Sequence, residues 1–124
     1  MFAFEGLEIW QSALVLAGEI YDATDLFPRR EQFALSQRLT RAVVSIGANI
    51  AEGKSKSSSK KFSRYIEITY GFLCELVAEL HVAKRRSYIK EDQFKELYTQ
   101  AEHLGKMLSK FRATLETSWI KNSV

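Results

Sequence analysis

Five basic side chains fall within eleven residues of this chain, and no acidic residue stands among them. They are Lys54, Lys56, Lys60, Lys61 and Arg64, with serines between them. Ammonium groups, serine hydroxyls and the N-terminus of a following helix can all bind phosphate oxygens. The run therefore predicts contact with nucleic-acid phosphates. The other interpretation is a solvated loop that keeps the protein soluble.

A second set of polar residues recurs at steps of three or four just before this run. The set, called the polar seam below, comprises Arg38, Arg41, Ser45, Asn49 and Glu52. Such spacing places them along one flank of a helix. If the next helix returns antiparallel, Glu75 lies within reach of Arg38 and predicts an ion pair. The seam is either a groove for a ligand or RNA, or a structural element that sets helix register or closes a subunit interface.

Residue types that support catalysis are present but lack the spacing of known catalytic or metal sites. Glu75 and Glu79 lie four residues apart, as solvated or ion-paired carboxylates often do. Neither His81 nor His103 follows an arginine at the spacing that helical ribonucleases use, and the Glu-x-x-His pair of di-iron bundles does not occur. The single cysteine, Cys74, lies in an apolar run, which predicts a small buried residue. We therefore expect no enzymatic activity, no metal site and no cofactor.

Composition and charge bound the class of protein. At 124 residues, with 46% hydrophobic and 27% charged residues, the chain has the size and balance of one globular domain. The N-terminus has no basic segment and no apolar run approaches about 18 residues, so we expect no signal peptide, no membrane span and a cytoplasmic location. Residues 1–28 hold five acidic residues and no base, whereas residues 29–64 hold nine basic and two acidic residues. These blocks indicate a polyanion site or a neighbouring subunit of opposite charge.

Four stretches with helical periodicity must position these residues. Apolar residues recur at steps of three and four over about 5–24, 28–52, 59–87 and 90–118. Pro28 suits the first turn of the second helix. Gly53 suits a left-handed residue after the end of that helix. One of Ser57, Ser58 or Ser59 is expected to cap the third helix.

Short connections make sequential helices antiparallel, which predicts an all-α, up-down-up-down four-helix bundle. An extended coiled coil is the alternative, but three short breaks favour the bundle. The first helix is expected to bury a stripe that includes Leu14 and Tyr21. Several aromatic and apolar residues at or beyond the stripes suit subunit contacts: Trp10, Tyr21, Tyr98, Trp119 and Ile120.

The second predicted helix carries the residues of a known family. The segment reads Gln37-Arg38-Leu39-x-Arg41-Ala42-x-x-Ser45-Ile46-x-x-Asn49-Ile50-Ala51-Glu52-Gly53. With Phe27-Pro28-x-x-Glu31 before it and Gly71-x-Leu73-x-Glu75-Leu76 after it, the chain resembles the four-helix-bundle proteins encoded in intervening sequences of bacterial 23S ribosomal RNA genes. The resemblance covers about residues 4 to 115. Phe72 and Arg85-Arg86-Ser87 depart from the family pattern, which has a serine and a neutral leucine-glycine ending there.

The resemblance implies a cytoplasmic bundle that assembles as a ring-like homopentamer. We therefore expect a noncatalytic module that binds RNA or another nucleic acid, with the basic run as its contact surface. The alternative is a protein-interaction scaffold that contacts no nucleic acid.

Overall fold

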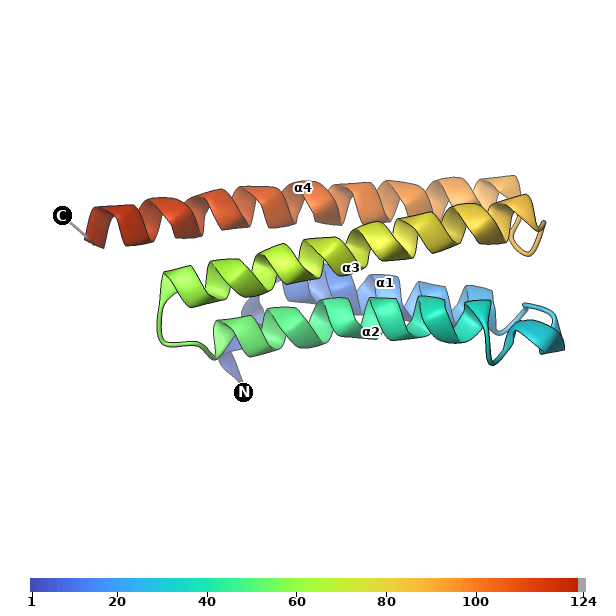
Figure 1. Ribbon diagram of the computed structural model, residues 1–124, viewed down its shortest axis with the longest axis horizontal. Coiled ribbons are helices and arrows are strands. Elements are labelled where there is room, and N and C mark those ends of the chain that lie inside the picture. The colour runs from blue at the N-terminus through green and yellow to red at the C-terminus, as the bar shows by residue number, and fades with distance from the viewer. Residues whose placement is uncertain (123–124) are drawn as a thin grey trace.

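The computed structural model describes residues 1–122, which contain four α-helices and no strand. The helices are α1 (Glu8–Thr24), α2 (Leu35–Lys54), α3 (Ser59–Arg85) and α4 (Glu91–Asn122), and short 3-10 helices, η1 (Ala3–Gly6) and η2 (Arg29–Glu31), precede α1 and α2. Sequential helices run antiparallel, with α1 and α3 each packed between α2 and α4 (Figure 1). The predicted all-α bundle is confirmed. Within the described residues, no helix has both the length and the apolarity that crossing a membrane requires.

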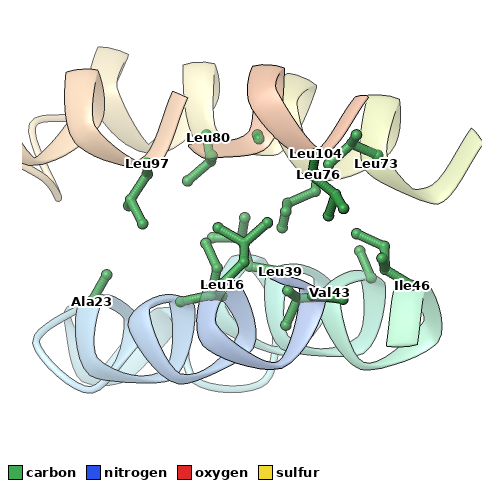
Figure 2. Packing of buried hydrophobic residues seen from close by; sticks show 14 of the residues in the cluster. Leu16, Ala23, Leu39, Val43, Ile46, Leu73, Leu76, Leu80, Leu97 and Leu104 are labelled. Carbon is green, nitrogen blue, oxygen red and sulfur yellow. The ribbon is translucent and has the colours of Figure 1, made fainter. Parts of the chain in front are cut away.

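The core is built from apolar side chains that all four helices direct toward one another (Figure 2). Its fully buried members include Leu16, Ile20, Leu39, Ile46, Leu76, Leu80, Leu104 and Leu108. Each buried side chain of this size stabilises the fold by about 1.5–3 kcal/mol relative to exposure. The apolar spacing predicted for the second, third and fourth helices is confirmed in their central turns, where Leu39, Leu76 and Leu104 are buried.

The stripe predicted for the first helix was rotated from the true one. Leu14 and Tyr21 are 56% and 47% exposed, whereas Ile9, Ala13 and Leu16 are buried.

The second helix begins seven residues later than predicted. Pro28 precedes η2 rather than the first turn of α2. The chain leaves helical geometry at Ala34, with φ −129° and ψ −103°, and α2 begins at Leu35. Phe33, in this connection, is 90% exposed.

Gly53 was predicted to follow the end of α2 in a left-handed conformation, and this prediction was wrong. The helix continues through Gly53 to Lys54, and among the described residues the one positive φ of a non-glycine residue belongs to Ser87, with none at a glycine. A Cβ atom at position 53 would lie 2.7 Å from Tyr65 Cβ and 2.9 Å from Phe62 Cδ1. Glycine is required here because α3 approaches the backbone of α2.

Local hydrogen bonds close both ends of α3. Ser58 Oγ accepts a backbone N–H of the first turn at 3.2 Å, which confirms a serine cap. At the other end, the Ser87 N–H donates to Lys84 O and the Tyr88 N–H donates to Ala83 O, both at 2.9 Å. This is a Schellman motif, and Ser87 occupies its left-handed position with φ 62°.

Candidate nucleic-acid interface

Four exposed cations gather where α2 ends and α3 begins. Lys54 ends α2, and Lys60, Lys61 and Arg64 stand in the first turns of α3. We call these four residues the lysine end. None of them takes part in the ion pairs found within residues 1–122. The N-terminus of α3, a helix of 27 residues, adds its partial positive charge.

Lys56 behaves differently from the other bases of the run. Its Nζ lies 3.9 Å from Glu52 Oε1 and 5.1 Å from the centroid of the Tyr65 ring. The Tyr65 hydroxyl donates to the same Glu52 oxygen at 3.2 Å. Lys56 is therefore held against the α2–α3 hairpin, so the predicted phosphate contact falls mainly to the four residues of the lysine end.

The polar seam makes short-range bonds rather than one pocket. Asn49 Nδ2 donates to Ser45 O at 2.8 Å, and both residues are half-buried. Arg38 and Arg41 are exposed, and Glu52 contacts the loop. The bonds of Ser45, Asn49 and Glu52 close within α2, its connection to α3 and the first turns of α3, which favours the structural interpretation for these three residues.

The predicted ion pair between Arg38 and Glu75 is not among the ion pairs of the described chain. Gly53 packs on Tyr65, so the antiparallel register places Arg38 opposite the turn that contains Glu79. The positive charge of Arg38 acts on the Glu79 carboxylate. The predicted ion pair was displaced by one helical turn, because Gly53 lies opposite Tyr65 and the hairpin therefore turns about a later position than the prediction assumed.

Glu79 is the titratable group that sequence analysis misplaced. It is only 9% exposed, and its Oε1 has no hydrogen-bond partner within residues 1–122. Its pKa is raised to about 7, first by burial and then by charge repulsion from Glu75 and a hydrogen bond with that carboxyl, while Arg38 opposes the rise. Its position between buried Leu76 and Leu80 was the available signal. No group of three or more potential metal-ligating residues occurs in the described part of the chain.

A groove of about 670 Å³ runs between α3 and α4. Cys74 lines it and is exposed, so the prediction of a buried cysteine was wrong. Cys74 faces the neighbouring helix α4 rather than the core, one position along from buried Leu73. Tyr70 and Tyr98 line the same groove and are 43% and 37% exposed. His81 also lines it, with its ring 5.0 Å from that of Phe94, and Tyr98 is its other aromatic neighbour.

The residues expected to make subunit contacts separate into two groups. Trp10 is half-buried within its own chain, against the ring of Phe4 at 4.9 Å and against Gly47. Trp119 is half-buried in the last turns of α4. Tyr21 and Tyr98 are exposed and remain available to a neighbour.

Comparison with known proteins identifies relatives of this fold and sequence. Residues 5–110 match the model of the 23S rRNA-intervening sequence protein family. The crystal structure of a protein with unknown function from the S23 ribosomal protein family of Bacteroides thetaiotaomicron VPI-5482 aligns with a TM-score of 0.77. The two sequences are 24% identical, and the alignment covers 84% of this chain and 97% of the other, which shows a common fold. No curated protein matches the chain.

Proposed function

Because this chain belongs to the 23S rRNA-intervening sequence protein family, we propose that it is a noncatalytic, self-associating bundle that binds RNA through its lysine end. The observation that carries the proposal is the set of four exposed cations beside the N-terminus of α3. Charges in this arrangement bind phosphates without reading base sequence. An RNA partner of this kind would place the protein in the cytoplasm.

Self-association is the second part of the proposal, and we expect a homopentamer. The acidic segment 1–28 and the basic segment 29–64 can attract one another across a subunit boundary. Leu14 and Tyr21 on α1, both exposed, offer apolar contact area for a neighbour. A ring would repeat the lysine end on one rim, so that individually weak phosphate contacts add.

Light scattering coupled to size-exclusion chromatography tests the assembly. Five copies of the 14.2-kDa chain should give a particle of about 71 kDa at moderate salt. A monodisperse monomer at micromolar concentration would contradict self-association. The measurement does not depend on RNA, so it separates the two parts of the proposal.

RNA binding is tested by its dependence on salt. Each phosphate contact contributes about 0.9 to the slope of log affinity against log salt for duplexes, and about 0.7 for single strands. Replacing the lysine end together, as Lys54→Gln, Lys60→Gln, Lys61→Gln and Arg64→Gln, should weaken binding to all sequences and flatten this slope. A matched variant removes the same charge from exposed positions just before and along α4, by Lys90→Gln, Lys95→Gln, Lys106→Gln and Lys110→Gln. This variant should keep the affinity and the salt slope of the unmodified protein. Equal binding by the two variants, or undetectable binding at low salt, would refute the lysine end as the contact surface.

A protein-interaction scaffold is the second candidate, and the α3–α4 groove favours it. The groove is large, and its exposed Tyr70 and Tyr98 resemble the aromatic residues enriched at protein interfaces. If this function is correct, Tyr70→Ala with Tyr98→Ala should change the mass of the native complex, and the unmodified protein should bind no RNA even at low salt.

A further inference from the structure

Four arginines gather at the end of the bundle opposite the lysine end. Arg29 and Arg30 belong to η2, and Arg85 and Arg86 end α3. The α1–α2 and α3–α4 connections lie together at this end (Figure 1). We call these four residues the arginine end. Arg85 and Arg86 belong to the segment in which this chain departs from the neutral ending that the family resemblance predicts.

Tyr88 contacts one arginine from each of the two pairs. Arg30 Nη2 donates to the Tyr88 hydroxyl at 3.4 Å, and the Arg86 guanidinium lies 5.9 Å from the Tyr88 ring centroid. The Tyr88 hydroxyl in turn donates to Glu31 Oε2 at 2.7 Å. Its ring packs 5.4 Å from that of buried Phe27. Guanidinium groups from two distant segments are thus fixed around one aromatic ring.

Two partners of Tyr88, Glu31 and Arg86, also line a cavity of about 280 Å³. Its lining residues are Glu31, Ala34, Leu35, Arg38, Val82 and Arg86. Leu35 and Val82 give it apolar walls, Arg38 and Arg86 supply hydrogen-bond donors, and Glu31 supplies an acceptor. The hydrogen bond from Tyr88 lowers the pKa of Glu31, so the carboxylate is ionised at neutral pH.

Phe33 directly precedes Ala34, which lines this cavity, and Phe33 is 90% exposed. A single exposed apolar residue needs no explanation. Here, however, one end of the molecule carries three features together. They are an exposed aromatic ring, a cavity with apolar walls and both hydrogen-bond donors and acceptors, and four arginines. Proteins bind single-stranded RNA with these three features: aromatic rings stack on the bases, polar groups hydrogen-bond to the base edges, and cations contact the phosphates.

We infer that the arginine end binds single-stranded RNA, with bases stacked on Phe33 or seated in the adjacent cavity and phosphates on the exposed arginines. A flat anionic membrane fits less well. Glu91 and Asp92 open α4 at the same end and would repel it, and Lys84 is already paired with Glu91 at 3.3 Å. A flexible strand can pass around these carboxylates. The inference concerns a surface other than the lysine end and stands independently of it.

Fluorescence anisotropy with a labelled single-stranded RNA of about twelve nucleotides tests the inference. Loss of one stacked base should weaken binding by about tenfold or more, so Phe33→Ala should bind the single strand correspondingly less tightly. Val44→Ala is the matched control, because Val44 is 50% exposed in the middle of α2. Arg85→Gln with Arg86→Gln should lower the salt slope by about 1.4, the value for two single-strand phosphate contacts. An abasic oligonucleotide of equal length should not distinguish Phe33→Ala from the unmodified protein.

Unchanged binding of the single strand by Phe33→Ala and by the double arginine variant would overturn the inference. Binding to phosphatidylserine vesicles that depends on Phe33, with no RNA binding at this end, would overturn it in favour of a membrane. If the lysine-end variant loses all RNA binding while the arginine-end variants bind normally, the inference fails and the proposed function stands. The reverse result supports the inference and removes the lysine end as the contact surface.

Discussion

Replacing Glu79 with glutamine should make the protein more stable at neutral and alkaline pH. In the folded protein the pKa of Glu79 is raised from 4.5 to about 7, chiefly by burial and then by Glu75. The folded state therefore binds a proton more tightly than the unfolded chain does. Its contribution to stability is fully present below about pH 4.5 and is lost as the pH rises through about 7.

The size of the effect follows from the difference between these two pKa values. Each unit is worth about 1.4 kcal/mol, so ionised Glu79 costs the folded state about 3 kcal/mol above pH 8. Glutamine matches the shape of the protonated carboxyl and can donate its amide N–H to Glu75. Arg38, which loses a neighbouring charge, is exposed, so the lost attraction costs little. We expect Glu79→Gln to gain about 2–3 kcal/mol at pH 8 and almost nothing at pH 4.5.

Urea unfolding followed by circular dichroism between pH 4.5 and 8.5 measures this effect. Protomer concentration must be constant, because self-association shifts apparent stability. Glu96→Gln, at an exposed position of α4, should follow the pH dependence of the unmodified protein. If Glu79→Gln shows the same pH dependence as the unmodified protein, or is less stable at pH 8, then Glu79 is already ionised and compensated in the fold.

Four further substitutions test the glycine contacts of the helices and the two ends of α3. Gly53→Ala should destabilise the protein by about 1–3 kcal/mol in denaturant titrations, because its Cβ would lie 2.7 Å from Tyr65 Cβ. Gly71→Ala, in open space on α3, should instead stabilise the protein by about 0.5–1 kcal/mol. If both substitutions changed stability in the same direction, the close contact at Gly53 would not be what requires glycine there. Ser87→Gly should raise stability by about 1 kcal/mol, seen as a higher melting temperature, because φ is 62° there; a lower melting temperature would contradict this. Ser58→Ala should lose about 1 kcal/mol with its cap, and an unchanged urea midpoint would show that the cap contributes nothing.

Sequence patterns predicted the helices well and their limits poorly. Apolar spacing identifies a helix over many turns, so local exceptions barely change the prediction. The start of α2 depends on one residue, Ala34, whose unusual dihedral angles no propensity of alanine indicates. Gly53 was recognised as special for the wrong reason, since its close neighbour Tyr65 belongs to another helix. Contacts between helices are not encoded in the spacing within one helix.

The candidate sites show the same division. The lysine end was predicted as part of a run of five bases that also includes Lys56, because these residues fall within eleven positions and a run of charge is visible in the sequence alone. The arginine end was missed as a unit because α2 and α3 separate Arg30 from Arg86 in the sequence. Tyr88 joins them only after the chain has folded. Burial of Glu79 likewise depends on the register between α2 and α3.

The connectivity of the bundle has a consequence for how it opens. Helices that follow one another in the sequence are joined by short connections, but α1 and α4 meet through residues that are far apart in the sequence. Gln100 is hydrogen-bonded to Glu19, 81 positions away, and Ser12 to Met107, 95 positions away. Closing so long a loop costs chain entropy that local pairing does not. We therefore expect the contact between α1 and α4 to form last during folding and to open first in the native state. We expect opening of this contact, and not global unfolding, to set how fast the amide protons along it exchange with water.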